Sequence, residues 1–257
     1  MISILEQREV FHIAFLRLFS AKVRHDAYAL KGGVNLRLFC GSGRYSEDMD
    51  LDIAGIELFK LKDIVMNILG SKSLITTLQP YQITKVVPPD IKTAKQTDTT
   101  QRFKCHLLTS QGADLFTKIE FSRRALQTQV AAGSIDAAVL RRYKLAPFVI
   151  PHYPAETALT QKIGALAGRS ETEARDIFDI YILSPKVDIK KVVANKDISD
   201  DVMKKAHDNV FRIDFNIYRD TVLTYLAKED QDIYGTKEAW DDIQIRVSEL
   251  IEGLRRK

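Results

Sequence analysis

Three aspartates at alternate positions, Asp48, Asp50 and Asp52, have the type and spacing that most clearly suggest chemistry. Apolar residues lie between them, and this alternation predicts a β-strand with the three carboxylates on one face. Such neighbours lie roughly 6 to 7 Å apart at Cα, so the carboxylates repel one another unless a cation neutralises them. Because Mg²⁺ prefers carboxylate oxygens and keeps positions for water and phosphate, Asp48 and Asp50 suit it as ligands. An exposed acidic edge is the alternative.

A glycine pair, Gly32-Gly33, precedes the aspartates, and Asp48 follows Gly33 by fifteen residues. The pattern predicts a short strand over 28–31, the glycine turn, a short helix over 35–39 and then the acidic strand. Backbone without Cβ at the entrance to a helix offers N–H groups and a positive dipole end to a triphosphate. This order of elements would hold phosphates and their metal ions in one small pocket.

Hydrophobic periodicity predicts the elements that must position these residues. Helical spacing marks 4–23 and 56–69, and strand character marks 81–87, 103–109 and 114–122. Beyond Ser134 the strand signal fades and helices follow near 135–145, 155–167, 171–182, 200–210, 215–227 and 237–254, with Ser170 and Glu173 as a capping box. A change of composition over 148–154 places a domain boundary there. We therefore expect an α+β protein with a mixed sheet and helices in 1–150 and a helical domain in 151–257.

Composition is that of a globular protein, since 45% of the 257 residues are hydrophobic and 28% are charged. The net charge of +4 permits a polyanionic partner without requiring one. Cys40 and Cys105 are too few for a disulfide scaffold, and neither a secretory signal nor an apolar run long enough for a membrane span is present. We expect a cytoplasmic protein with no membrane partner.

The segment around the glycines and aspartates resembles the signature of the AbiEii/AbiGii toxins of the DNA polymerase β-like nucleotidyltransferase superfamily. The matching positions are Leu30-Lys31-Gly32-Gly33-Val34-Asn35-Leu36-Arg37-Leu38, Gly41, Arg44 and Ser46-Glu47-Asp48-Met49-Asp50-Leu51-Asp52. The resemblance implies that Gly32, Gly33, Arg44 and Ser46 lie near the nucleotide. It also implies that Asp48 and Asp50 hold two Mg²⁺ ions, for which Mn²⁺ could substitute. The family commonly has Thr and Ala where this chain has Val34 and Asn35.

A second block is similar to the family's later Lys, Arg and Arg-Asp-x-x-Asp motif. It comprises Ala158-Leu159-Thr160-Gln161-Lys162-Ile163-Gly164-Ala165-Leu166, Arg169 and Arg175-Asp176-Ile177-Phe178-Asp179-Ile180-Tyr181. Lys162 falls on one predicted helix, and Asp176 and Asp179 share a face of the next. A lysine that reaches a triphosphate neutralises charge that grows in phosphoryl transfer. An ion pair that only fixes the helix hairpin is the alternative, but the resemblance favours catalytic roles for Lys162 and Asp176 and nucleotide binding by Lys162, Arg169 and Asp179.

A third carboxylate usually completes the superfamily's site from a neighbouring strand and can accept the proton of the attacking hydroxyl. The alternation of 116–122 places Lys118 and Glu120 on one strand face. Glu120 is therefore the candidate catalytic residue and metal ligand, with Asp114 and Asp52 as competitors. A surface glutamate paired with Lys118 is the remaining alternative.

The resemblance implies a nucleotidyltransferase toxin of a type IV toxin–antitoxin system, which acts in abortive infection and phage defence. Such an enzyme transfers a nucleoside monophosphate from an NTP to an acceptor hydroxyl and releases pyrophosphate, with tRNA 3′ ends as acceptors in characterised relatives. Basic groups in the helical half could bind that acceptor through its phosphates. The antitoxin would be encoded elsewhere without a stable complex, and the chain would act as a monomer.

Three other functions remain open from the sequence. Related nucleotidyltransferases modify protein side chains, so the acceptor could be a protein. A catalytically silent domain that binds nucleotide or RNA is the second. The third is a metal-dependent nuclease, although Lys118-Ile119-Glu120 reverses the usual Glu-x-Lys order of such enzymes.

Overall fold

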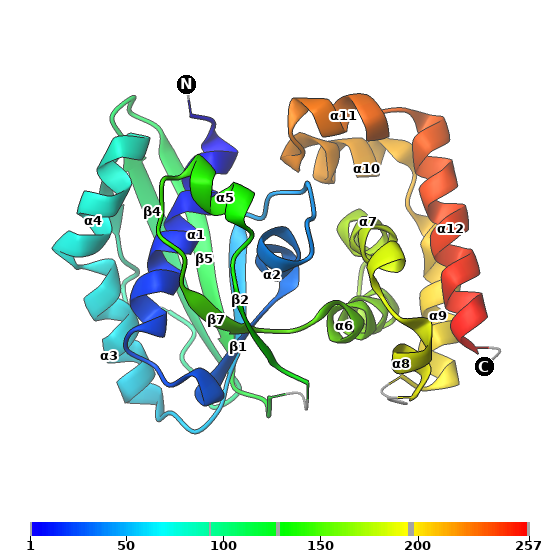
Figure 1. Cartoon of the computed structure of the whole chain (residues 1–257), viewed down its shortest axis with the longest axis horizontal. Helices are drawn as coiled ribbons and strands as arrows, with labels where there is room; N and C mark the ends of the chain where they lie inside the picture. The colour runs from blue at the N-terminus through cyan, green and yellow to red at the C-terminus, as the bar shows by residue number, and fades with distance from the viewer. Residues whose placement is uncertain (1, 93, 127–128, 195–197, 256–257) are drawn as a thin grey trace. The chain divides into compact units, whose positions relative to one another are not determined.

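In the computed structural model, which describes residues 2–92, 94–126, 129–194 and 198–255, the chain forms two compact units (Figure 1). Unit 1 comprises residues 1–39 and 45–153, and unit 2 comprises 40–44 and 154–257. Unit 1 contains the β-sheet, and the elements described after residue 155 are helical. The predicted α+β class is therefore confirmed, with a mixed sheet in the N-terminal half.

Seven strands in the described residues form one sheet in the order β3-β4-β5-β2-β1-β7-β6. The strands are β1 (Tyr28–Lys31), β2 (Asp48–Ile53), β3 (Ile83–Val87), β4 (Thr100–Thr109), β5 (Asp114–Ser122), β6 (Ala131–Ser134) and β7 (Val149–His152). The pairs β2–β5 and β1–β7 are parallel, and the others are antiparallel. The acidic strand β2 thus lies at the centre of the sheet, between β5 and β1.

One face of the sheet forms the core of unit 1. Because successive strand residues point to opposite faces, Leu51 and Phe121 are buried on this side while the aspartates of β2 lie on the other. Three helices, α1 (Ile4–Ser20), α3 (Leu58–Leu69) and α4 (Lys72–Leu78), pack against the core face (Figure 1). The rings of Phe19 and Phe121 are 5.4 Å apart. This packing leaves the opposite face of β2 and β5 to polar side chains.

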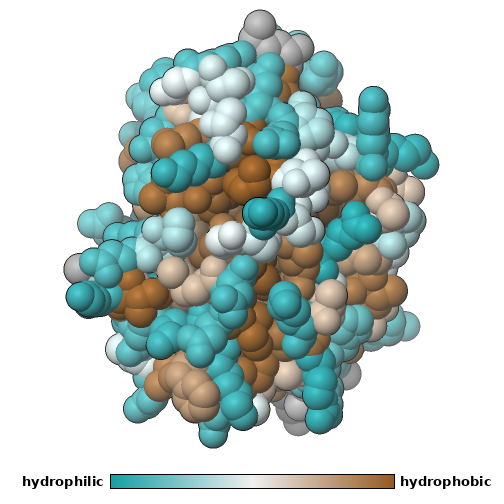
Figure 2. Space-filling model, turned by 90° about the vertical axis from the view of Figure 1, so that its left-hand side faces the viewer, coloured by the Kyte–Doolittle hydropathy of each residue, from teal (hydrophilic) through white to brown (hydrophobic). Residues whose placement is uncertain are grey.

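On the face of the molecule that Figure 2 shows, hydrophobic side chains lie among hydrophilic ones. Phe59 on α3 is one of the exposed apolar residues. Scattered apolar residues of this kind are usual on soluble domains and need no partner. No described helix is long and apolar enough to cross a membrane.

Unit 2 is an assembly of helices around buried aromatic residues. Its helices are α6 (Ala155–Gly168), α7 (Ala174–Leu183), α8 (Ile189–Ala194), α9 (Asp200–Asn209), α10 (Phe215–Thr221), α11 (Lys228–Tyr234) and α12 (Lys237–Arg255). The Trp240 ring stacks on Tyr218 at 4.1 Å, and α6 packs against both α7 and α9. The segment 40–44 joins this unit, where Lys186 donates a hydrogen bond to the carbonyl of Cys40.

Several predicted elements are wrong in detail. The strand signal does not end at Ser134, because β7 pairs with both β1 and β6; it is only four residues long and contains Pro151, which hid it. The predicted 215–227 helix ends at Thr221, and α4, α8 and α11 were not predicted. The predicted capping box at Ser170 and Glu173 is absent: Glu173 is itself the N-cap of α7, and its carboxylate pairs with neighbouring arginines.

Candidate active site

The register of the central strands brings the predicted acidic residues onto one face. On β2, Asp48 lies opposite Lys118 of β5 and Asp50 lies opposite Glu120. On its other edge, Asp50 lies opposite Lys31 of β1. Because adjacent strands are about 4.8 Å apart, Glu120 and Asp50 are direct neighbours across the sheet. The structure therefore brings together Asp48, Asp50 and Glu120, as the sequence predicts.

Cations neutralise this cluster of carboxylates. Lys118 Nζ lies 2.9 Å from Asp48 Oδ2 and 3.9 Å from Glu120 Oε2. Arg102 of β4 donates from Nε to Glu120 Oε2 at 2.7 Å. Burial raises the pKa of Asp50, and the positive charges of Lys118 and Lys31 oppose that rise. The ionised form of Asp50 is thus costly in the protein alone, and a further cation would stabilise it.

The two competitors of Glu120 for the role of third carboxylate are engaged elsewhere. Asp52 accepts hydrogen bonds from Lys31 and, at 2.7 Å, from the hydroxyl of Tyr153. Asp114 pairs with His106 at 2.9 Å and precedes Glu120 by six residues on β5, roughly 20 Å along the strand. Of the three, Glu120 therefore has the geometry that the prediction requires.

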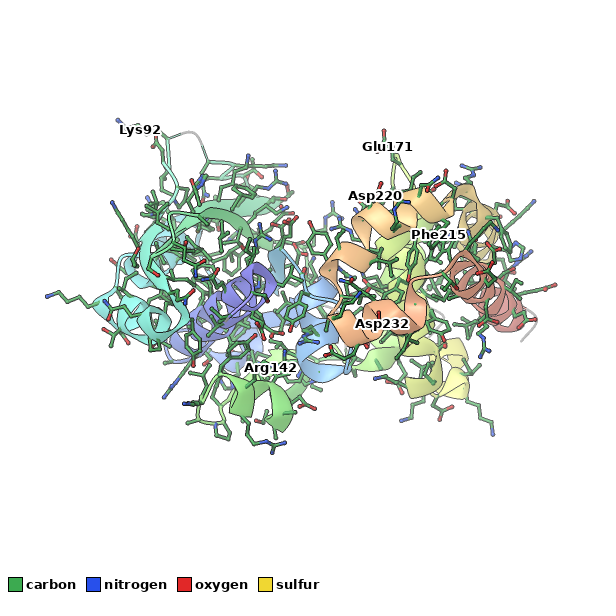
Figure 3. The ribbon with its side chains drawn as sticks, turned by 90° about the horizontal axis from the view of Figure 1, so that it is seen from above. Lys92, Arg142, Glu171, Phe215, Asp220 and Asp232 are labelled. Atoms are coloured by element: carbon green, nitrogen blue, oxygen red, sulfur yellow. The ribbon has the colours of Figure 1, made fainter. Side chains whose placement is uncertain are left out.

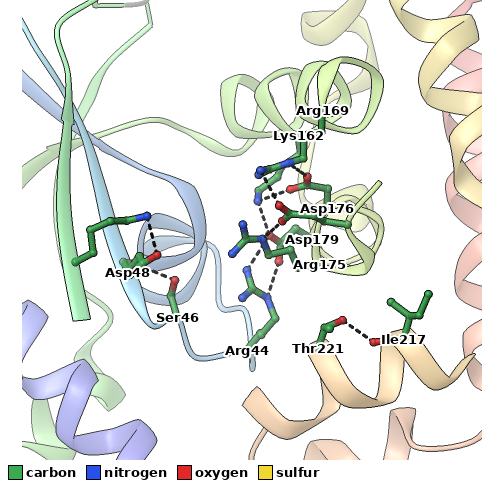
Figure 4. Close-up of polar contacts among 12 residues, drawn as sticks. Arg44, Ser46, Asp48, Lys162, Arg169, Arg175, Asp176, Asp179, Ile217 and Thr221 are labelled. Carbon is green, nitrogen blue, oxygen red and sulfur yellow. Dashed lines mark hydrogen bonds and ion pairs between the residues drawn. The ribbon is translucent and has the colours of Figure 1, made fainter. Parts of the chain in front are cut away.

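The Gly32-Gly33 pair lies directly against the acidic strand and belongs to the helix itself, which begins before the predicted residue 35. Gly32 begins α2 (Gly32–Phe39) with a φ of 68°, and a Cβ placed there would lie 2.8 Å from Asp50 Oδ2. Gly33 follows in the first turn of α2, whose N–H groups have no partner within the helix. Ser46 donates from Oγ to the carbonyl of Asp48 at 2.9 Å and so fixes the start of β2 (Figure 4). The start of α2 thus lies beside the carboxylates of β2.

Substituting Gly32 by alanine is expected to displace the Asp50 carboxylate and to lower the nucleotide-transfer activity that the resemblance implies at least about tenfold. The positive φ alone costs a non-glycine residue roughly 1–2 kcal/mol of stability. The Gly55→Ala variant is the matched control, because Gly55 has a φ of 69° and nothing within 4 Å of its Cβ position. Both variants should lose similar stability in chemical denaturation, and only Gly32→Ala should lose activity. Equal activity in the two would contradict the proposed contact.

The donor set of this cluster fits a hard divalent cation. Asp48, Asp50 and Glu120 offer carboxylate oxygens, the ligands that Mg²⁺ prefers. Across the described part of the chain, no group of three or more His, Cys, Asp or Glu side chains is already gathered closely enough to hold a metal ion. Instead, the ammonium of Lys118 supplies positive charge beside Asp48. For Asp48 to become a metal ligand, its ion pair with Lys118 would have to break.

The second predicted motif forms a buried ion network in unit 2 (Figure 4). Lys162 Nζ lies 2.9 Å from Asp176 Oδ1 and 2.7 Å from Asp179 Oδ2. Arg169 donates from Nε to Asp176 at 2.6 Å, and Arg44 binds Asp179 through Nε and a terminal nitrogen at 3.1 and 2.9 Å. Both aspartates are fully buried. The network joins α6, α7 and the 40–44 segment.

Electrostatics within this network favour the charged forms of Asp179 and Lys162. Burial by itself would raise the pKa of Asp179, but Arg44 and Lys162 outweigh it and hold that pKa below its ordinary value. Burial likewise opposes the charge of Lys162, yet Asp179 and Asp176 raise its pKa. The interhelical ion pair considered from the sequence is therefore present, and Arg44 is tied to Asp179. Roles of Arg44, Lys162, Arg169, Asp176 and Asp179 toward a nucleotide stay predictions.

Sequence reasoning missed two contributors to the cluster in unit 1. Arg102 pairs with Glu120 but precedes the predicted 103–109 strand, whereas β4 begins at Thr100. Tyr153 hydrogen-bonds Asp52 and lies in the segment that was predicted to be a domain boundary. Extending the polar and apolar alternation backwards from Phe103 would have found Arg102 on the polar face. No local signal marks Tyr153, because its contact spans 101 residues of sequence.

Comparison with known proteins places the chain among nucleotidyltransferases. Residues 14–250 match the family described as "Nucleotidyl transferase AbiEii toxin, Type IV TA system". The fold is similar to that of MenT4, a nucleotidyltransferase toxin from Mycobacterium tuberculosis H37Rv, with a TM-score of 0.60 and 16% identity over 95% of this chain and 82% of that one. JHP933 from Helicobacter pylori gives a TM-score of 0.56 and 19% identity over 97% and 94% of the two chains. No curated protein matches the sequence significantly.

Proposed function

The chain belongs to the AbiEii family of type IV toxin–antitoxin nucleotidyltransferases, and on that premise we propose that it transfers a nucleoside monophosphate from an NTP to a tRNA 3′ end. Family membership implies an NTP substrate and an antitoxin. The observation that carries the proposal is the register that sets Asp48, Asp50 and Glu120 on one sheet face, with Gly32 against Asp50. These are the groups needed to bind a metal–triphosphate complex.

Each residue has a role that follows from its position. Asp48 and Asp50 would hold Mg²⁺, with Glu120 completing the oxygen ligands, and two such ions would supply Lewis acidity to the hydroxyl and neutralise triphosphate charge. The N–H groups at the start of α2 would bind phosphate oxygens. The acceptor oxygen forms a bond to the α-phosphorus, the bond to the bridging oxygen breaks, and pyrophosphate leaves. Glu120 would accept the proton of the acceptor hydroxyl.

Label transfer tests this function directly. Purified tRNA is incubated with Mg²⁺ and each of the four α-³²P NTPs in turn, with the wild type and with Asp48→Ala. We expect label on tRNA from the wild type with at least one NTP and none from the variant, because the variant lacks a metal ligand. Retained transfer by Asp48→Ala would refute the mechanism. Label on protein alone would identify a protein acceptor, and RNA cleavage without label would identify a nuclease.

A further inference from the structure

A basic pocket adjoins the candidate site on the polar face of the sheet. It has a volume of about 550 Å³, and Lys95, Arg102, Lys104 and His106 contribute to its lining. Arg102, Lys104 and His106 alternate along β4, and Lys95 comes from the loop that precedes that strand. Lys92 lies at the outer tip of the same loop and points away from the sheet (Figure 3). The pocket therefore lies between one strand and the loop that precedes it.

Hydrogen bonds fix the loop wall to the strand. The N–H of Arg102 donates to the carbonyl of Lys95 at 2.9 Å, and Gln96 Nε2 donates to the carbonyl of Arg102 at 3.3 Å. Gln101 Nε2 donates to Gln96 Oε1 at 2.7 Å. His106 is held by its 2.9 Å contact with Asp114. The backbone at Lys95 is thus hydrogen-bonded to β4, the strand that carries the other cations of the pocket.

The pocket carries an excess of positive charge. Its described lining has Lys95, Arg102, Lys104 and the carboxylate of Asp90; because Arg102 already pairs with Glu120, the excess comes from the two lysines against Asp90. Lys104 lies directly opposite Lys118 in the β4–β5 register, and like charges in that arrangement destabilise a sheet. Over the described residues, neither Lys95 nor Lys104 forms an ion pair. An anion bound in the pocket would offset this repulsion.

Arg102 connects the pocket to the carboxylates. It donates to Glu120, which lies opposite Asp50, so β4 and β2 are about 10 Å apart with β5 between them. Gly32 approaches Asp50 from the β1 side of β2, whereas Arg102 lies on the β5 side. The glycine turn offers N–H groups to a triphosphate on its own side. An anion bound on the β4 side is therefore not this triphosphate. It belongs to another molecule, or it takes part in another step of the reaction.

We propose that this pocket binds backbone phosphates of the single-stranded end of an acceptor RNA and so directs its terminal hydroxyl to Asp50 and Glu120. The inference rests on the proposed function, because it assigns the second substrate of that reaction. Lysine and arginine are the usual phosphate ligands, and such contacts fix the position of a strand without reading its sequence. The acceptor would approach from the β4 side, with Lys95 and Lys104 as binding residues rather than catalytic ones.

The test uses a fluorescein-labelled single-stranded RNA of about twelve nucleotides with a free 3′ hydroxyl, titrated in the absence of NTP. Each phosphate contact contributes about 0.7 to the slope of log affinity against log salt, or roughly fivefold at 0.1 M salt. The Lys95→Ala/Lys104→Ala variant should therefore bind about 25-fold more weakly, with a slope reduced by about 1.4. The control is Lys22→Ala/Lys72→Ala, which removes the same charge from two exposed lysines outside the pocket. It should bind like the wild type.

Label transfer to tRNA then separates this inference from the proposed function. We expect the pocket variant to show a raised KM for tRNA, with kcat and the KM for NTP unchanged. Equal RNA affinity in the pocket and control variants, or no RNA binding by the wild type, would overturn the inference. If the wild type binds RNA through the pocket but transfers no label, the proposed transfer fails while the pocket assignment stands.

Discussion

Substituting Asp50 by asparagine is expected to lower nucleotide transfer by at least about a thousandfold without unfolding the chain. The change keeps the shape of the side chain against Gly32 but removes the charge that would hold a metal ion. A loss of about 4 kcal/mol of transition-state stabilisation, which is typical of a lost metal contact, corresponds to a thousandfold in rate. Single-turnover label transfer at saturating Mg²⁺ and NTP measures it.

Stability distinguishes a lost ligand from a damaged fold. Because burial raises the pKa of Asp50, its ionised form costs the folded state free energy, and the neutral amide should leave the unfolding free energy unchanged or higher. Asp63→Asn makes the same chemical change at an exposed carboxylate on α3 and should retain full activity. An Asp50→Asn enzyme with wild-type rates would exclude Asp50 from the metal site.

The acidic strand and its partner could be predicted from sequence because their signal is local. A period of two places the β2 aspartates on one face whatever the rest of the chain does, and the same rule places Lys118 beside Glu120 on β5. The pairing of β2 with β5 depends on strand order, which no local pattern encodes. The sequence could name Glu120 as the candidate, but setting Asp114 aside required the register, and so did finding Arg102 beside Glu120.

The elements and contacts that were not predicted are short or depend on residues far apart in the sequence. The four residues of β7 all pair with those of β6, which is itself only four residues long, and β7 joins the rest of the sheet through its pairing with β1, more than a hundred residues earlier. Likewise, Arg44 lies in a glycine-rich turn, and only the folded chain shows that Asp179, 135 residues later, binds it. The Arg-Asp-x-x-Asp spacing did place Asp176 and Asp179 on one helix face, since that arrangement follows from helical periodicity alone.

Removing the Asp179 carboxylate, as in Asp179→Ala, is expected to lower the unfolding free energy of unit 2 by about 3–5 kcal/mol. The variant would leave Arg44 and Lys162 buried, with Asp176 as the remaining carboxylate beside Lys162. An uncompensated buried charge is what makes the loss large. Denaturation followed by the fluorescence of Trp240 reports on this unit, because the sequence has one tryptophan and it is buried there.

An exposed ion pair in the same unit provides the control. Asp232 lies 3.3 Å from Lys228, with both side chains largely exposed, so Asp232→Ala should cost at most about 1 kcal/mol. A comparable loss of unfolding free energy in Asp179→Ala and Asp232→Ala would show that burial of the Asp179 network adds no stability beyond that of an exposed ion pair. The conservative Asp179→Asn change should fall between them, because an amide can still accept a hydrogen bond from Arg44 but carries no charge.

The pH dependence of this difference identifies its cause. Arg44 and Lys162 hold the folded-state pKa of Asp179 below its ordinary value of 3.8, despite burial. A depressed pKa contributes stability that is fully present above the unfolded-state pKa and is lost as pH falls through the folded-state pKa. The gap between wild type and Asp179→Ala should therefore be constant above about pH 5 and shrink only below about pH 4. A gap that already closes between neutral pH and pH 5 would show that another titrating group, and not the Asp179 charge, joins the 40–44 segment to its helices, and a gap that does not shrink even below pH 4 would point to packing.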